Sequence, residues 1–389
     1  MHFRTRAVHV GQERDPQTGA VVPPIHLAST YVQPGAGQWG EFDYSRSGNP
    51  TRKALETTLA SLESGVGGLA FASGMAATHC VTMLLEHGDH VVAGTDIYGG
   101  TYRLLHKILS RSGIEATLAN SADLDALEAA MRPETKLVWI ESPGNPLLSI
   151  TDIAACAELA HRHGALLGVD STLATPVLTR PLELGADVVM HSATKFLGGH
   201  SDLLGGALVV KDAALLKRLY FIQNATGGVM GPLEAFLCSR GIKTLELRVR
   251  EQCRTAARLA EFLAADRRVA RVLYPGLPNH PGHEIACRQM DGGFGAMVTF
   301  EVPVPISSQG LAAAKRLVES TRLFQLAVSL GAVESLIEQP AAMSHASYDR
   351  AARLAHGITD NLVRLSVGLE AFEDLRDDLD HALTQAAAV

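Results

Sequence analysis

Short apolar runs and segments of helical periodicity alternate along the first two thirds of the chain. The apolar runs are rich in Val, Leu and Ala and have the length of buried strands. They cover residues 68–73, 89–94, 135–142, 165–170, 186–192 and 205–211. The helical segments cover residues 50–64, 74–87, 101–113 and 150–164. This alternation predicts an α/β fold in which helices flank a mostly parallel sheet.

The two ends of the chain follow other patterns. The first 48 residues are rich in Pro, Gly and polar side chains, which predicts an extended arm. The spacing over 232–266 predicts one long helix, and a smaller mixed unit of strands and helices follows it. We therefore divide the chain into an N-terminal arm (1–48), a large domain (49–235) and a small C-terminal domain that includes the long helix (236–389).

Composition and charge narrow the range of partners. The formal net charge is −7 with no long basic run, so nucleic acid is not expected as a partner. No stretch approaches ~20 uninterrupted apolar residues, and the N-terminus lacks the apolar core of a secretory signal, so no membrane partner is expected. The five cysteines are scattered and form no C-x-x-C pair, which predicts free thiols in the cytoplasm.

Asp170 and Lys195 are the first candidates for chemistry. Asp170 ends one apolar run, and Lys195 lies just past the next one. Because consecutive parallel strands end at the same edge of a sheet, the two side chains should lie close together. Pyridoxal 5′-phosphate needs such a pair, since its aldehyde takes an amine as a Schiff base and its pyridinium nitrogen needs a buried anion. Either residue alone is more simply explained as a turn cap or a surface lysine.

Neighbouring residues strengthen the pyridoxal-phosphate interpretation. Ser192 and Thr194 place two hydroxyl groups close to Lys195. Gly74 stands at a strand-to-helix junction, where free N–H groups and the helix dipole attract phosphate. Tyr98 precedes two glycines, and its ring can stack on a flat cofactor.

Two competing motifs are rejected. Residues 65–70 match the G-x-G-x-x-A pattern of dinucleotide sites, but a helical segment precedes them and a strand-like run follows, the reverse of what that site requires. His280 and His283 flank a Pro-Gly pair and have no third ligand nearby in sequence, so we expect no metal site.

Taken together, these segments resemble the pyridoxal-phosphate enzymes of cysteine and methionine metabolism, the transsulfuration family. The resemblance covers almost the whole chain, from residue 21 to residue 370. It implies the type I, aspartate aminotransferase-like fold of these enzymes, with a smaller α/β domain at the C-terminus. The segments that carry it are YSRSGNPTR, FASGMAA, DIYGGTYR, ESPGNP, HSATKFLGGHSD, SLGAVESL and LVRLSVGLE.

The resemblance implies a cofactor role for nine residues. Lys195 would hold the cofactor as a Schiff base and act as catalytic base, Asp170 would pair with the pyridine nitrogen, and Tyr98 would stack on the ring and serve as a catalytic acid. The phosphate would be bound by Gly74, Met75, Ser192 and Thr194. Tyr44 and Arg46 would reach the cofactor of the neighbouring subunit, which implies a homotetramer made of two active dimers.

The resemblance also implies how a substrate binds. Arg364, helped by Asn145 and Ser329, would bind the α-carboxylate. The sequence supports this role of Arg364, because an arginine between Val and Leu is costly to bury without an anion. Arg103 and Val328 would contact the distal part of the substrate.

Within the family, the sequence looks most like cystathionine γ-lyase. This implies a carbon–sulfur lyase that converts cystathionine to cysteine, 2-oxobutanoate and ammonia, with methionine as a further substrate. Methionine γ-lyase as the main activity, and a γ-synthase that joins an O-acyl-homoserine to cysteine, are the alternatives. A catalytically dead binding protein is not expected, because every cofactor anchor is present.

Several positions depart from the family pattern. Val328 stands where cystathionine-using members carry glutamate, and it resembles the methionine γ-lyases. Gly100 stands where many bacterial methionine γ-lyases have cysteine, and Asp43 replaces a more usual glutamate. Ser171 and Leu173, beside the cofactor aspartate, also differ from the family. The sequence therefore leaves the preferred substrate open.

Overall fold

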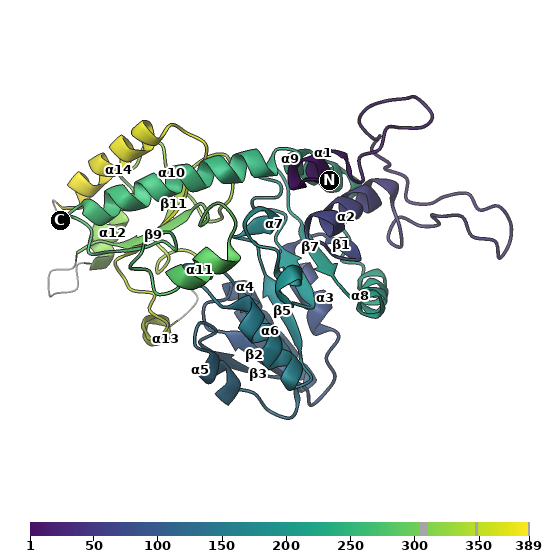
Figure 1. Ribbon diagram of the computed structural model, residues 1–389, viewed down its shortest axis with the longest axis horizontal. Coiled ribbons are helices and arrows are strands. Elements are labelled where there is room, and N and C mark those ends of the chain that lie inside the picture. Colours follow the sequence, from purple (N-terminus) through teal and green to yellow (C-terminus); the bar gives the residue numbers. More distant parts are fainter. Residues whose placement is uncertain (304–309, 347–348, 388–389) are drawn as a thin grey trace.

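The computed structural model describes residues 1–303, 310–346 and 349–387. Two sheets and the helices around them make up most of this chain, and a long arm projects from the body (Figure 1). The α/β fold predicted from the alternating pattern is confirmed. In the described part of the chain, no helix combines the length and the apolar character needed to cross a membrane.

The larger sheet has seven strands in the order β1-β7-β6-β5-β4-β2-β3. Only β7 runs antiparallel to its neighbours, so the sheet is mostly parallel as predicted. The predicted strands are present, and β3 is an additional one that the apolar runs did not show. The strands are β1 (Gly67–Phe71), β2 (His90–Gly94), β3 (Glu115–Ala119), β4 (Thr135–Glu141), β5 (Leu166–Asp170), β6 (Val188–His191) and β7 (Gly206–Val210).

Helices cover both faces of this sheet, because alternate residues of its strands are apolar on opposite sides. Leu167 and Val169 of β5 belong to a core with α2 (Pro50–Leu62), α6 (Ile153–Arg162) and α9 (Pro232–Ile242). Met190 of β6 belongs to a second core with α3 (Gly74–Thr82) and α8 (Ala213–Thr226). The other elements of this unit are α4 (Gly99–Arg103), a π-helical turn (Leu104–Ile108), a 3-10 turn (Leu109–Ser112), α5 (Leu124–Ala129), α7 (Thr175–Leu178) and a 3-10 turn (Pro181–Leu184).

The smaller sheet has five strands in the order β10-β11-β12-β9-β8. One face packs on three helices in a third core, and the other face is turned toward the larger unit, where Thr299 of β9 donates to the carbonyl of Pro146 at 2.7 Å. The strands are β8 (Arg271–Leu273), β9 (Met297–Glu301), β10 (Gln325–Leu326), β11 (Leu336–Glu338) and β12 (Leu362–Ser366). The helices are α10 (Leu245–Ala265), α11 (His283–Gln289), α12 (Gly310–Val318), α13 (Arg350–Ala355) and α14 (Phe372–Ala386).

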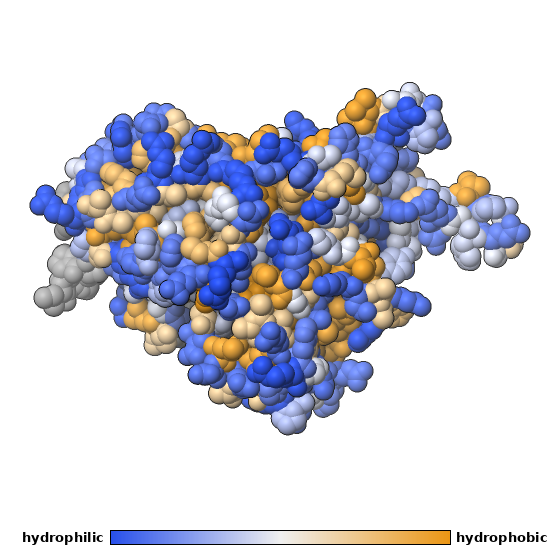
Figure 2. All heavy atoms as spheres, viewed as in Figure 1, coloured by the Kyte–Doolittle hydropathy of each residue, from blue (hydrophilic) through white to orange (hydrophobic). Residues whose placement is uncertain are grey.

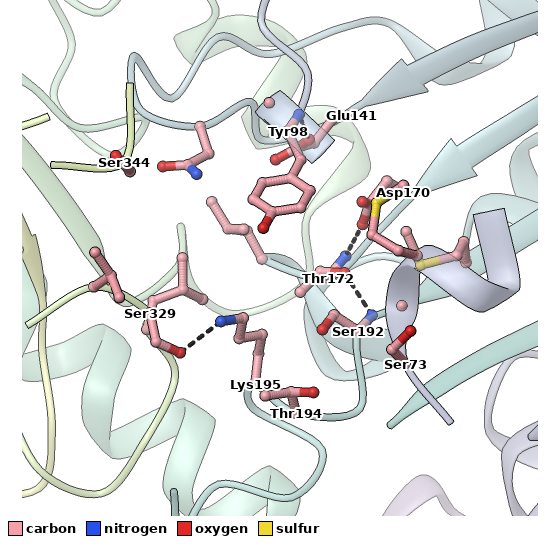
Figure 3. A pocket seen from close by; sticks show the side chains of 18 of the residues that line it. Ser73, Tyr98, Glu141, Asp170, Thr172, Ser192, Thr194, Lys195, Ser329 and Ser344 are labelled. Atoms are coloured by element: carbon pink, nitrogen blue, oxygen red, sulfur yellow. Dashed lines mark hydrogen bonds between the residues drawn. The ribbon is translucent and has the colours of Figure 1, made fainter. Parts of the chain in front are cut away.

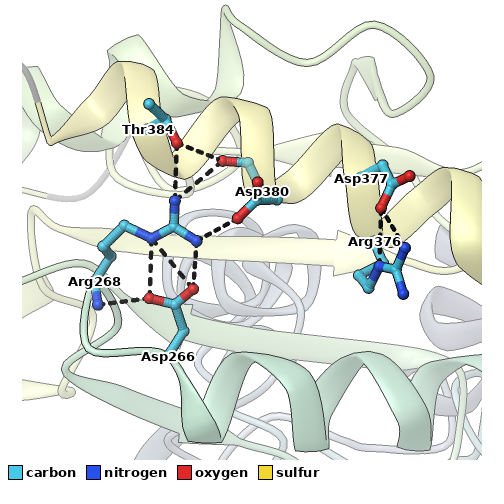
Figure 4. A network of polar contacts seen from close by, with 6 residues as sticks. All are labelled: Asp266, Arg268, Arg376, Asp377, Asp380 and Thr384. Carbon is cyan, nitrogen blue, oxygen red and sulfur yellow. Dashed lines mark hydrogen bonds and ion pairs between the residues drawn. The ribbon is translucent and has the colours of Figure 1, made fainter.

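Helix α10 joins the two units. Leu245 and Val249 in its first half belong to the core of the larger unit, whereas Leu259 and Leu263 in its second half belong to the core of the smaller one. At the far end, Arg268 donates to Asp266 just after α10, and to Asp380 and Thr384 on α14 (Figure 4). This arginine fixes the end of α10 against the last helix of the chain.

The single long helix predicted over 232–266 is wrong. The structure has two helices there, α9 and α10, separated at Lys243 and Thr244. The guanidinium of Arg248 donates to the carbonyls of Gly241, at the end of α9, and of Phe196. These bonds tie the first turn of α10 to the end of α9 and to the loop that carries Phe196.

The N-terminal arm is shorter than the predicted one. Residues 3–9 form α1 (Phe3–His9), which packs on α2 and buries Ala7. Residues 10–48 form loops that project from the body (Figure 1). Val32 and Trp39 in these loops are 99% and 74% exposed, and Figure 2 shows hydrophobic atoms on both projecting loops.

Candidate active site

A cavity of about 390 Å³ lies where the carboxyl ends of β4, β5 and β6 meet the smaller unit. This is the edge of a parallel sheet at which ligands bind. Twelve of the fourteen predicted site residues line it, and Figure 3 shows how several of them face the same space. The twelve are Gly74, Met75, Tyr98, Arg103, Asn145, Asp170, Ser192, Thr194, Lys195, Val328, Ser329 and Arg364.

Asp170 is a buried carboxylate at the end of β5. Its Oδ1 accepts the N–H of Thr172 at 3.0 Å, and the Thr172 hydroxyl accepts the N–H of Ser192 at 2.8 Å. Burial raises the pKa of the Asp170 carboxyl, while the Thr172 hydrogen bonds and nearby His191 act to lower this pKa. A buried carboxylate at the rim of a cavity fits a ligand that brings a cation or an N–H donor.

Lys195 reaches the same cavity from the loop after β6. Its Nζ donates to the hydroxyl of Ser329 at 2.5 Å. Burial and the Arg364 cation lower the pKa of Lys195 and Glu338 raises it, and the net pKa is about 8. Ser329 has φ +89, a left-handed backbone that is strained for a residue with a side chain. Because its pKa is about 8, part of the Lys195 amine is neutral near pH 7.

The first turn of α3 and the loop before Lys195 form one end of the cavity. Ser73 caps α3 through its hydroxyl, and the N–H groups of Gly74 and Met75 have no acceptor within the helix. A Cβ on Gly74 would lie 3.1 Å from Cβ of Ser192, so glycine allows this close approach. Thr194 exchanges two hydrogen bonds with Gly205, which braces the loop. This end suits a phosphate group.

Tyr98 lies over the cavity at the start of α4, and its side chain is 47% exposed. Its backbone N–H donates to Oε2 of Glu141 at 2.7 Å. A Cβ on Gly100 would lie 2.4 Å from Cε1 of the Tyr98 ring, so a side chain at this position would clash with the ring where it now lies.

The smaller unit supplies the opposite wall. Arg364 of β12 lies opposite Glu338 of β11, with 2.8 Å between Nη1 and Oε1. Arg364 also donates to Oδ1 of Asn145 at 2.9 Å and to the carbonyl of Ser329 at 2.6 Å. Its Nε is buried and has no hydrogen-bond partner among the described residues. This guanidinium keeps a donor for a ligand with an acceptor oxygen, such as a carboxylate.

The outer part of the cavity is more open. Val328 and Leu204 are 57% and 67% exposed there, and the exposed Arg103 adds a cation. No acid within the described residues forms an ion pair with Arg103. Leu173 lines the cavity as well. Ser171 does not, and its buried hydroxyl has no hydrogen-bond partner among the described residues.

Tyr44 and Arg46 do not line the cavity of their own chain. Both are exposed on the arm, where the Arg46 guanidinium lies 5.3 Å from the centre of the Tyr44 ring and donates to Asn224 of α8. Their predicted place in a neighbouring subunit stays a prediction.

Four residues with polar side chains at the site escaped the sequence prediction. They are Glu141, Thr172, Glu338 and Ser344. Glu141 could have been predicted from the sequence, because it lies at the end of the apolar run 135–142, much as Asp170 lies at the end of the run 165–170. Ser344, whose hydroxyl donates to Glu338 at 2.7 Å, lies in a stretch without periodicity and had none.

The fold and the cavity together define a pyridoxal-phosphate enzyme of fold type I. A sequence model of the family described as "Cys/Met metabolism PLP-dependent enzyme" matches residues 4–384, and the chain belongs to this family. Its cofactor is pyridoxal 5′-phosphate. The residues present fit this group: an amine, a buried carboxylate to which no cation of the described residues is bonded, and free N–H groups at a helix start surround one space.

Relatives with different activities are similarly close. The chain is 52% identical over 381 residues to a cystathionine gamma-synthase of Mycobacterium tuberculosis, covering 97% of this chain and 96% of the relative. It is 49% identical to a cystathionine beta-lyase of Lactococcus lactis, covering 98% of both. The crystal structure of a cystathionine gamma-lyase from Lactobacillus plantarum complexed with L-serine superposes with a TM-score of 0.95 at 45% identity and full coverage of both chains. Identity alone therefore does not assign the reaction.

Proposed function

We propose that the protein catalyses γ-elimination from a sulfur amino acid, with cystathionine as the first substrate. Cystathionine and water would give cysteine, 2-oxobutanoate and ammonia. The observation that carries the proposal is the place of the Lys195 amine, which lines one cavity together with Asp170, Tyr98 and the carboxylate-binding donors of Arg364.

The bound cofactor supplies an electron sink for negative charge at the Cα of the substrate. Lys195 would hold the cofactor and, once its amine is free, take the proton from Cα. Its lowered pKa of about 8 leaves part of the amine unprotonated near neutral pH, as a general base requires. The Tyr98 hydroxyl would give a proton to the departing sulfur. Ser329, bonded to Lys195 Nζ, would keep the amine on the substrate side of the cavity.

The remaining contacts would orient the amino acid. Arg364 and Asn145, with Ser329, would bind the α-carboxylate. Arg103 would meet a carboxylate at the distal end of cystathionine. Val328 offers no charge to a distal ammonium, and leaving such a group unmatched costs on the order of 1–3 kcal/mol if it is desolvated. This is enough to bias the choice of substrate without excluding cystathionine.

Two other activities follow from particular observations. The exposed apolar Val328 favours methionine, whose side chain ends in a methyl group. The 52% identical gamma-synthase favours the joining of an O-acyl-homoserine to cysteine. In that reaction the acyloxy group would leave Cγ as a carboxylate and the thiol of cysteine would add there, whereas in elimination no thiol adds.

One assay separates these activities. Purified protein loaded with pyridoxal phosphate is supplied with cystathionine, methionine or homocysteine, and 2-oxobutanoate is measured. An O-acyl-homoserine plus cysteine is tested in parallel for cystathionine formation. We expect the fastest release of 2-oxobutanoate from cystathionine. Release from none of the three, together with cystathionine formation in the parallel reaction, would refute the lyase proposal.

We further propose that the active protein is a homotetramer made of two dimers that share their sites. The exposed arm would carry Tyr44 and Arg46 to the cofactor phosphate of the neighbouring subunit. Mixing Arg46→Ala protein with Lys195→Ala protein under conditions of subunit exchange should then restore activity, because one of the two sites in a hybrid dimer is intact. Failure of the mixture to recover any activity would contradict shared sites. The five free cysteines, four of them buried, agree with a place in the reducing cytoplasm.

A further inference from the structure

Glu141 is a buried carboxyl group at the cavity to which the proposed reaction gives no task. It is the last residue of β4 and pairs in register with Asp170 of β5. Only 4% of its surface is exposed, and Glu141 is one of the residues that line the cavity. A carboxyl group placed beside another buried carboxylate is costly, so a specific contact is needed to explain it.

The contact of Glu141 is with the backbone of Tyr98. Oε2 accepts the Tyr98 N–H at 2.7 Å. Tyr98 is the N-cap of α4, a five-residue helix, and its side chain makes no capping bond. Figure 3 shows the Glu141 carboxyl next to this backbone and the Tyr98 ring extending from it over the cavity. The start of α4, and with it the ring, is thus tied to the rigid end of a sheet strand.

We propose that Glu141 is a positioning residue that holds the backbone of Tyr98 and so fixes the ring in its place over the cofactor. The inference rests on the proposed contact of Tyr98 with the cofactor. It does not depend on which amino acid is the substrate.

The charges around Glu141 agree with this task. Burial, Asp170 and Asp96 raise the pKa of the Glu141 carboxyl well above its usual range, and Arg364 lowers it only in part. A protonated carboxyl group still offers an oxygen to the Tyr98 N–H, but it adds no second negative charge beside Asp170. Glutamine has the same shape, the same acceptor and no charge, so it is the matched conservative variant.

The test measures the affinity of the cofactor-free protein for pyridoxal phosphate, together with the visible circular dichroism of the bound cofactor. Glu141→Ala removes the acceptor of the Tyr98 N–H and so frees the start of α4 to move, and we expect the dissociation constant to rise about tenfold and the dichroic band to shrink. Glu141→Gln should stay within about twofold of the wild type, as should Glu134→Ala, an exposed glutamate just before the same strand.

A double-mutant cycle shows whether Glu141 acts through Tyr98. With Tyr98→Ala already present, Glu141→Ala should weaken the cofactor less than about twofold further. Additive losses would overturn the proposal, because Glu141 would then act independently of the ring. Tenfold loss in Glu141→Gln would overturn it as well, because charge rather than the acceptor would matter.

Two further outcomes are informative. If Glu141→Ala does not fold, as judged by far-ultraviolet circular dichroism, the glutamine variant decides alone: retained affinity supports the proposal and a tenfold loss overturns it. A wild type that binds the cofactor but releases no 2-oxobutanoate would refute the proposed function, while these affinities would still test Glu141.

Discussion

The two walls of the cavity hold their charged groups in different ways. On the wall of the seven-stranded sheet, Asp170 receives an N–H from Thr172 and has no ion pair with a cation of the described chain. On the wall of the five-stranded sheet, Arg364 is already matched by Glu338, and both side chains are buried. The first wall therefore leaves a charge for its ligand to balance. On the second wall, Glu338 already balances most of the charge of Arg364, so this wall offers a ligand directed hydrogen-bond donors instead of net charge.

This difference teaches how the site can bind two molecules in turn. A cofactor that stays bound can supply the missing cation beside Asp170 and stabilise the fold around it. On the proposed mechanism, a substrate that must enter and leave would meet a guanidinium whose charge is moderated by Glu338, so that geometry would select it more than net attraction does. Lys195 lies between the walls and is bonded to the second one through Ser329.

Removing the residue that joins the walls should have the largest effect. On the proposed mechanism, Lys195→Met would delete both the attachment of the cofactor and the general base, and we expect activity to fall by at least about a thousandfold. Release of 2-oxobutanoate and the visible absorption of the purified protein are measured together. Lys136→Met, an exposed lysine on β4, is the matched control and should behave as the wild type. Substantial activity in Lys195→Met would sink the assigned role.

The second wall is tested by comparing its two buried partners. Arg364→Lys loses the planar fork, and we expect KM for the amino acid to rise roughly 10- to 100-fold with a smaller change in kcat. Glu338→Gln keeps the shape of the partner and all donors of Arg364, so its KM should change by only about threefold. Steady-state kinetics separate KM from kcat. If net charge rather than donor geometry selected the carboxylate, KM would stay near the wild-type value in Arg364→Lys, which keeps the cation, and would fall in Glu338→Gln, which removes the opposing anion.

The two walls also differ in how far the sequence predicts them. Asp170 and Lys195 were predicted because β5 and β6 are consecutive in sequence and are neighbours in the sheet. Each follows a buried apolar run, which is a strong signal. Glu338 lies 26 positions before Arg364 and on a strand of three residues, too short to show a period. That pair is created by tertiary pairing of β11 with β12, and local sequence does not encode it.

The same reason explains the errors in the fold. The strand β3 has a mixed sequence and only one buried residue, so no apolar run marked it. The break between α9 and α10 falls in a segment of continuous helical spacing. It is stabilised by the side chain of Arg248, which bonds to Gly241 and to Phe196 of a distant loop. The pairing of β3 with β2 and the bond of Arg248 to Phe196 both join segments that are distant in sequence, so local sequence patterns do not predict them.

On the first wall, the ring of Tyr98 depends on the absence of a side chain at Gly100. A Cβ there would lie 2.4 Å from the ring and 2.8 Å from Sδ of Met75. In Gly100→Cys the ring must move, and we expect the dissociation constant of the cofactor to rise about three- to tenfold, the range of an aromatic stacking contact. In a Tyr98→Ala background the same cysteine should cost less than about twofold. An unchanged affinity in the single variant would show that the ring does not contribute to binding in its observed position.

The smallest expected effect is a shift in the pKa of Lys195, which lies between the walls and reports on the charges of the second one. In the cofactor-free protein, labelling of Lys195 by an amine-specific reagent should rise with pH around a midpoint of about 8, because burial and Arg364 lower its pKa from 10.5. Glu338 favours the charged amine, so Glu338→Gln should move the midpoint to lower pH, and Arg364→Met should move it to higher pH. Mass spectrometry of the labelled peptide gives the midpoint. Identical midpoints in the three proteins would mean that the ion pair of the second wall does not reach the amine, and burial alone would then have to account for its low pKa.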